Sequence, residues 1–202
     1  MRIVKRKLLI LPFMMFVCVP LAWSQTPSPI PSAGTSAAQA SAPPAARPKP
    51  CDAEENRQFD FWIGDWDVVT PDGKPAGTNL IKPILGGCVL HENWNGRGGL
   101  AGQSFNAYDA KRKRWHQTWV DGQGSVLLLD GRFANGAMAL SDKDMPGKPD
   151  ANAINEIIWT PIADGAVRQL WRTSHDGGKT WAVAFDGKYV RSARVQPQLI
   201  VK

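Results

Sequence analysis

Aromatic and polar side chains alternate between Cys88 and Asp121, and these residue types together can hold a small molecule. A spacing of two residues is typical of strands, whose successive side chains point to opposite faces. Indole rings supply apolar contact area, while amide, hydroxyl and carboxylate groups fix orientation. The pattern therefore predicts a strand face that lines a ligand cavity. Its residues are Glu92, Trp94, Ser104, Asn106, Tyr108, Trp115, Gln117 and Trp119, with Gln169 and Trp171 from a later segment.

Glu92 is the only carboxylate in this predicted lining and the one candidate for proton transfer. Burial would raise its pKa toward neutrality, as general acid–base catalysis requires. Hydrolysis by two carboxylates needs a second acid that faces the first. Asp121 is the only nearby acidic residue in phase with Glu92. We therefore expect binding rather than catalysis. The enzymatic alternative uses Glu92 as general acid or base and orients substrate with Asn106, Gln117 and Tyr108.

A third interpretation is a closed polar core in which Glu92 is bonded to an indole N–H or to Arg168. Buried polar groups normally find partners, so the same residues would fit such a core. The chain would then be a structural or interaction module of the cell envelope.

The three histidines, His91, His116 and His175, do not predict a metal site. His91 and His116 are out of phase with the predicted lining and should point outward, and His175 falls in a turn. The sequence contains no P-loop, no Gly-x-Ser-x-Gly and no Gly-x-Gly-x-x-Gly before a helix. We expect neither a metal nor a cofactor.

Turn signals recur every eight to twelve residues from Phe59 onward, which is typical of an all-β meander. A short helix is expected within Asp52–Phe61. The pattern predicts an antiparallel up-and-down β-barrel of about 8–10 strands, with a two-sheet sandwich as the alternative. The expected strands are Trp66–Thr70, Ala76–Leu85, Cys88–Trp94, Ala101–Tyr108, Trp115–Val120, Ser125–Phe133, Ala137–Ser141, Ile154–Thr160, Val167–Ser174 and Trp181–Val190, with a last piece at Gln198–Val201.

The N-terminal region predicts export. Residues 1–24 have a basic start, an apolar run too short to span a membrane and small residues before a cleavage site near Ser24. A lipid anchor on Cys18 is disfavoured because Phe16 and Val17 make a poor lipobox. Residues 25–50 are rich in Pro, Ala and Ser and predict a disordered tether. Residues 51–202 then form one barrel domain in the periplasm or outside the cell.

The charge of the chain is mainly a property of its first segment. The whole sequence carries 24 basic and 18 acidic residues, a net charge of +6, and residues 1–24 hold four of the basic ones. The remaining balance of +2 does not favour nucleic-acid binding. The one basic cluster, Lys111–Arg114, is interpreted as a solvated hairpin loop. Cys51 and Cys88 are expected to form a disulfide in an oxidising compartment.

Residues Ser174 to Trp181 match the Asp-box pattern Ser-x-Asp-x-Gly-x-Thr-Trp. The pattern occurs once, without the repeats of a propeller. We interpret it as a hairpin in which Asp176 accepts hydrogen bonds from turn amides, the glycines take positive φ and Trp181 packs beneath.

An ordered set of motifs carries a family resemblance. Gly64-Asp65-Trp66 opens the first strand, and the segments Gly87–Trp94, Ser104–Asp109, Trp115–Asp121 and Asp176–Trp181 follow in order. The set resembles the bacterial DUF1579-type family of exported, calycin- or lipocalin-like proteins. The resemblance implies a barrel whose floor is closed by Trp66 and, by analogy, small-molecule binding. It implies no catalytic residues. The expected partner is a small, partly apolar ligand, with neither nucleic acid nor stable membrane insertion.

Overall fold

The structure is a computed structural model that describes residues 50–148 and 150–194. The predicted signal peptide, the tether up to residue 49, Cys18 and the last strand piece at 198–201 lie outside the described residues. None of the described helices is long and apolar enough to cross a membrane.

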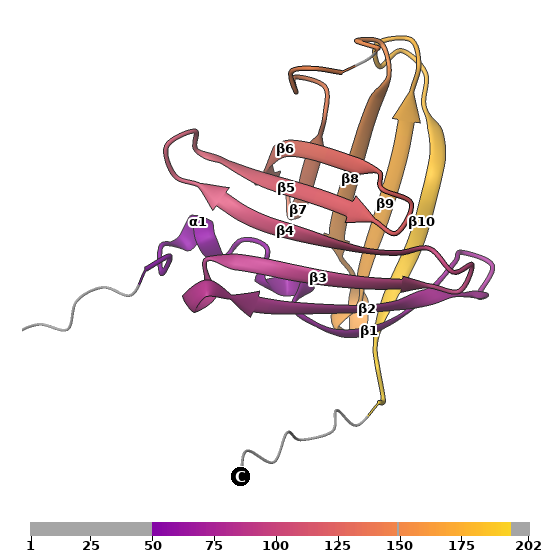
Figure 1. Cartoon of the computed structure of the whole chain (residues 1–202). Helices are drawn as coiled ribbons and strands as arrows, with labels where there is room; N and C mark the ends of the chain where they lie inside the picture. The colour runs from indigo at the N-terminus through magenta and orange to yellow at the C-terminus, as the bar shows by residue number, and fades with distance from the viewer. Residues whose placement is uncertain (1–49, 149, 195–202) are drawn as a thin grey trace, which may run out of the picture. The chain divides into compact units, whose positions relative to one another are not determined.

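Ten antiparallel strands form one closed barrel, so the barrel prediction is confirmed at the upper end of its strand range. Each strand pairs with its neighbours in sequence, and β1 pairs with β10 to close the ring. In Figure 1, β2 to β5 run across the view whereas β8 to β10 run up it. The strands are β1 (Gly64–Val69), β2 (Pro75–Ile84), β3 (Val89–Gly96), β4 (Ala101–Asp109), β5 (Arg114–Asp121), β6 (Val126–Ala134), β7 (Ala137–Ser141), β8 (Ile154–Pro161), β9 (Val167–Ser174) and β10 (Ala182–Arg191).

The strands form where the sequence alternates, because one face of each strand is covered by the barrel interior. On β5, for example, Trp115 and Gln117 are buried, whereas Arg114 is exposed. Observed strand ends fall within two residues of the predicted ones. Cys88 lies outside β3, because the 3-10 turn η2 (Leu85–Gly87) precedes it.

An N-terminal plug, residues 54–62, fills one end of the barrel. It consists of α1 (Glu54–Arg57) and the 3-10 turn η1 (Asp60–Trp62), which replace the single short helix expected over Asp52–Phe61. Phe59 and Trp62 are 0% exposed, and their rings stack at 4.9 Å. The Trp66 indole N–H donates to the Trp62 carbonyl at 2.8 Å and fixes the plug to β1.

The Cys51–Cys88 disulfide ties the chain just before the plug to the turn between β2 and β3. The structure therefore confirms the predicted pairing of the two cysteines. Its Cα–Cα distance of 5.1 Å lies in the ordinary range for disulfides.

The Asp-box segment is the hairpin between β9 and β10, as predicted. Asp176 accepts hydrogen bonds from the backbone amides of Lys179 and Thr180 and from the Thr180 hydroxyl. The hydrogen bonds from Thr180 are the main reason that the pKa of Asp176 falls to about 2. Gly177 and Gly178 have φ angles of 73° and 91°, and the Trp181 indole donates to the Gly178 carbonyl. These contacts agree with the hairpin predicted from the sequence.

Candidate functional site

The barrel interior contains a cavity of about 320 Å³. That volume lies near the lower end of the range for small-molecule sites, about 300–1,000 Å³. The cavity occupies the part of the barrel away from the plug, toward the hairpin between β3 and β4, whose Gly98 and Leu100 also line it. Six of the ten residues predicted from the sequence line it, namely Glu92, Trp94, Gln117, Trp119, Gln169 and Trp171.

The cavity wall also contains residues that the sequence pattern did not single out. Leu127, Ile157, Trp159, Phe185 and Tyr189 complete much of the wall. They lie at inward positions on β6, β8 and β10. The sequence of these strands mixes aromatic and aliphatic residues, a pattern typical of an ordinary hydrophobic core. Alternation in the sequence could identify these residues as inward-facing. It could not show which part of the barrel interior stays hollow.

Glycines on the inner face make room for the aromatic walls. A Cβ atom on Gly102 would stand 2.2 Å from the Trp119 ring, and one on Gly77 would stand 2.8 Å from the Trp94 ring. Gly187 has the same relation to Phe185, at 2.6 Å. These three rings thus lie over strand positions that have no side chain, which leaves the middle of the barrel less filled than alternating large residues would.

A buried hydrogen-bond network converges on Glu92. Asn79 Nδ2 donates to Glu92 Oε1 at 2.7 Å, and Ser104 Oγ donates to Glu92 Oε2 at 2.5 Å. Asn106 Nδ2 and Gln117 Nε2 donate in turn to Ser104 Oγ, at 2.8 and 3.3 Å. Because Ser104 already accepts two hydrogen bonds, its only proton is directed to the carboxylate. The network is therefore arranged around an accepting, ionised Glu92.

The closed-core interpretation named the wrong partners for Glu92. Its carboxylate contacts neither an indole N–H nor Arg168, which instead forms an ion pair with Asp186 at 2.6 Å. Arg168 is exposed because its position on β9 is out of phase with Gln169. Asp121 is not a second acid for Glu92 either, because Asp121 Oδ1 accepts the backbone amides of Gln123 and Ser125 in the next turn.

Burial raises the pKa of Glu92 to about 7, against the hydrogen bonds from Ser104 and Asn79, which lower it. The free energy of desolvation thus exceeds that of the two hydrogen bonds. Burial, together with the charge of Glu92, raises the pKa of Tyr189 well above its ordinary value of 10. Near neutral pH the cavity therefore contains a carboxyl group that exchanges its proton and a phenol that keeps it.

A second branch of the network fixes the amide of Gln169. Its Oε1 accepts from the Trp159 indole N–H at 3.0 Å and from the Tyr189 hydroxyl at 2.5 Å. Asn79 joins the two branches, since its Nδ2 also donates to the Tyr189 hydroxyl at 3.3 Å. Both contacts to Gln169 Oε1 come from donors, so the orientation of the amide is determined.

Four predicted lining residues lie elsewhere in the interior. Ser104 and Asn106 are 0% exposed and stand behind the cavity wall, where they hold Glu92 and Gln117. Tyr108 and Trp115 lie toward the plug, and their rings are 6.1 Å apart. The Trp115 indole N–H donates to Gln58 Oε1 in the plug at 3.3 Å.

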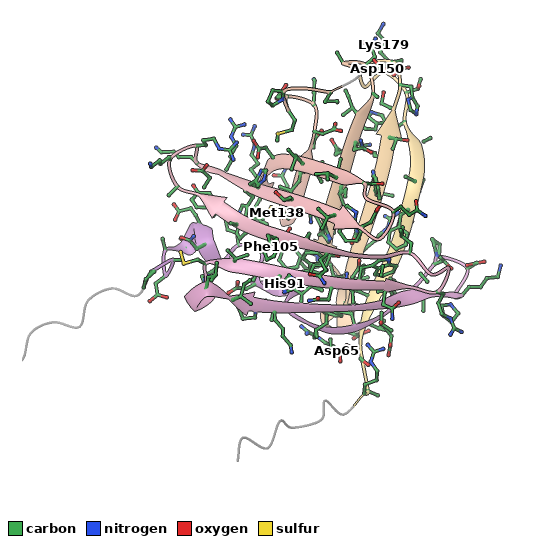
Figure 2. The ribbon with its side chains drawn as sticks, viewed as in Figure 1. Asp65, His91, Phe105, Met138, Asp150 and Lys179 are labelled. Atoms are coloured by element: carbon green, nitrogen blue, oxygen red, sulfur yellow. A yellow bond between two sulfur atoms is a disulfide. The ribbon has the colours of Figure 1, made fainter. Side chains whose placement is uncertain are left out.

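The outward positions of the histidines agree with their phase. His91 stacks on Phe105 at 4.9 Å, and Figure 2 shows the two labelled side chains together on β3 and β4. His116 contacts Asp130 at 2.7 Å on the same outer face. Among the described residues, no group of three or more His, Cys, Asp or Glu side chains could hold a metal ion.

In the basic cluster Lys111–Arg114, the first three residues lie in the exposed turn between β4 and β5, and Arg114 begins β5. Arg112 forms ion pairs with Asp109 at 2.7 Å and with Asp130 at 2.5 Å, which neutralise part of the positive charge of the cluster. This arrangement fits the predicted solvated hairpin loop.

No known family profile matches the chain, and no curated protein sequence matches it.

The pKa of Glu92 predicts a pH-dependent stability. The folded-state pKa, about 7, is above the reference value of 4.5, so the folded state retains a proton that the unfolded state releases between these values. The free energy of unfolding should therefore fall by about 3 kcal/mol as the pH rises from about 4.5 to about 8. Urea unfolding of wild type and Glu92→Gln over this range measures the effect.

Other groups titrate equally in the two proteins, so the difference between their unfolding free energies isolates Glu92. As the pH rises, we expect the unfolding free energy of the wild type to fall relative to that of Glu92→Gln. Parallel stability profiles would show that Glu92 has no raised pKa in the folded protein.

Proposed function

We propose that this protein is an exported, calycin-like barrel that holds a small, partly apolar molecule. The observation that carries the proposal is the cavity of about 320 Å³, walled by tryptophans and supplied with a few polar groups. The closed barrel and the disulfide are compatible with export to an oxidising compartment. The DUF1579-type resemblance supports the same function by analogy alone.

Two polar atoms on the cavity wall are left available for a ligand. Within the described residues, Gln117 uses its Nε2 to donate to Asn106 and Ser104, whereas its Oε1 has no hydrogen-bond partner. Gln169 uses its Oε1 as an acceptor, and its Nε2 likewise has no partner there. The two amides thus offer a ligand one acceptor and one donor, on side chains that the network already holds in place. Preorganised groups of this kind reduce the entropy cost of binding.

The proposal predicts saturable binding of N-phenyl-1-naphthylamine, a neutral apolar fluorescent probe, together with quenching of tryptophan fluorescence. Trp119→Ala should raise its dissociation constant by about tenfold or more, because it removes a wall of the cavity. Trp181→Ala is the matched control, since Trp181 packs in the hairpin between β9 and β10 and should leave the affinity unchanged. Fluorescence titration measures both.

Native mass spectrometry of protein purified from its own host measures the mass of any small molecule that remains bound to it. A mass increment that is present in wild type and lost in Trp119→Ala would support the proposal. If the probe does not bind and no small molecule accompanies the protein, the ligand-binding proposal is wrong.

A catalytic role for Glu92 is the second candidate, favoured by one observation: a carboxyl group with a pKa of about 7 lines the cavity. Such a group can donate or accept a proton near neutral pH. Of the three residues expected to orient a substrate, only Gln117 lines the cavity, whereas Asn106 and Tyr108 do not. An enzyme would lose turnover in Glu92→Gln and retain affinity for the probe.

A further inference from the structure

The charge of the cavity wall has one sign. Glu92 and Tyr189 are the only titratable residues among the described residues that line it, and no Lys, Arg or His is among them. An anionic ligand would therefore enter without a counter-charge and close to a carboxyl group. Burial of an unpaired charge of this kind is costly, so the wall disfavours anions.

Aromatic residues surround the same space. Trp94, Trp119, Trp159, Trp171 and Phe185 all line the cavity with Glu92. The electron-rich faces of aromatic rings attract cations, most strongly when water is excluded. A carboxylate together with several indoles is a combination that compensates a positive charge while also covering an apolar carbon skeleton.

The geometry around Glu92 prepares it to be ionised. Both of its partners, Asn79 Nδ2 and Ser104 Oγ, are donors, so they stabilise the carboxylate rather than the neutral acid. Each carboxylate oxygen can accept a further hydrogen bond in addition to the one that it already receives. The carboxylate is held in position and retains capacity for a donor from the cavity.

We propose that the ligand of this cavity is a small organic ammonium compound, whose cationic nitrogen lies beside the Glu92 carboxylate and whose apolar body packs among the tryptophans. The inference rests on the proposed ligand-binding function and names its chemical class. A cavity of about 320 Å³ restricts the ligand to a small molecule.

Binding of such a cation is coupled to a proton on Glu92. Burial keeps the pKa of the empty site at about 7, and an adjacent positive charge lowers it. The groups that face Glu92 are Asn79 from β2, Ser104 from β4 and Tyr189 from β10. Only Tyr189 among them titrates, and it stays neutral because its pKa is raised. The affinity should therefore follow Glu92 alone and fall as the pH drops below about 7.

The test compares three ligands with one apolar body: 2-phenylethylamine, 2-phenylethanol and 3-phenylpropionate. Isothermal titration calorimetry at about pH 8 should show the amine binding at least about tenfold more tightly than the alcohol, and the carboxylate binding most weakly. At about pH 5 the preference for the amine should largely disappear, because Glu92 is then protonated. Near pH 7, amine binding should release part of a proton, measured in buffers of different ionisation enthalpy.

Glu92→Gln should remove the preference for the amine over the alcohol, because it removes the carboxylate that pairs with the ammonium group. Glu156→Gln is the matched control, because Glu156 is paired with Arg172 away from the cavity, at 2.6 Å. It should keep the wild-type preference. If Glu92→Gln does not fold, the pH profile and the proton release of the wild-type protein decide the question.

The outcomes separate this inference from the function on which it rests. If N-phenyl-1-naphthylamine binds and depends on Trp119, but the alcohol binds as tightly as the amine at about pH 8, the ammonium inference is overturned and the binding function stands. If none of the three ligands binds, the inference also fails. The probe titration and native mass spectrometry then decide whether the cavity binds any small molecule.

Discussion

Replacing Trp62 with alanine is expected to lower the free energy of unfolding by about 4 kcal/mol, because truncation of a fully buried aromatic residue leaves a cavity. Trp62 is 0% exposed and is the last residue of the plug. Its ring stacks on Phe59 at 4.9 Å and lies 5.3 Å from the ring of Trp159. Because Trp159 also lines the cavity, the plug supports one side of the cavity wall. We expect weaker probe binding in Trp62→Ala as well as lower stability.

Trp62→Phe is the informative companion variant. The Trp62 indole N–H is buried and has no hydrogen-bond partner among the described residues, so its removal eliminates an unsatisfied donor. Phe keeps an aromatic ring against Phe59, and this variant should lose much less stability than Trp62→Ala. Urea unfolding followed by tryptophan fluorescence measures both. If the two variants lose equal stability, packing of the ring is not what the plug contributes.

Loss of the disulfide is expected to have an effect of similar size. Cys51 and Cys88 are separated by 37 positions in the sequence. In the chain-entropy description, closing a loop of this length stabilises the folded state by about 4 kcal/mol. The double variant Cys51→Ser/Cys88→Ser should therefore unfold at much lower urea concentration than the wild type. Wild type treated with dithiothreitol should behave like the double variant, because it lacks the same covalent bond.

The disulfide variant also separates stability from binding. Cys88 lies next to η2, at the end of the barrel that the plug fills, and neither cysteine lines the cavity. Under conditions in which the double variant is folded, its affinity for N-phenyl-1-naphthylamine should equal that of the wild type. A large loss of affinity would show that the plug position, which the disulfide restrains, controls the cavity.

The strand assignment could be predicted from the sequence because each hairpin is a local structure. Alternation identified the inner face of β5 through Trp115, Gln117 and Trp119, and turn residues located its ends. The same reasoning placed His91 and His116 outside the barrel, where the structure has them. Pairing of neighbours in sequence then followed from short connections.

Alternation did not reveal how far along the barrel each inward side chain lies. Ser104 and Gln117 share the inner face, yet only Gln117 lines the cavity. Trp115 is in phase with Trp119 on β5 but contacts the plug instead of the cavity. Period-two spacing gives the face of a strand and carries no information about position along the barrel axis. A signal that could have helped is the set of inward glycines, Gly77, Gly102 and Gly187, which mark where rings lie over the strand.

The amino-acid sequence by itself determined the all-β class, the run of antiparallel strands and the choice of interior residues, because these depend on neighbours within one hairpin. Only the tertiary structure decided where the barrel is filled and where it is hollow. Closure of β1 against β10 brings Tyr189 to Asn79, which are 110 positions apart, and so completes the surroundings of Glu92. Contacts between residues so distant in sequence exist only after the ring closes, and no local pattern encodes them.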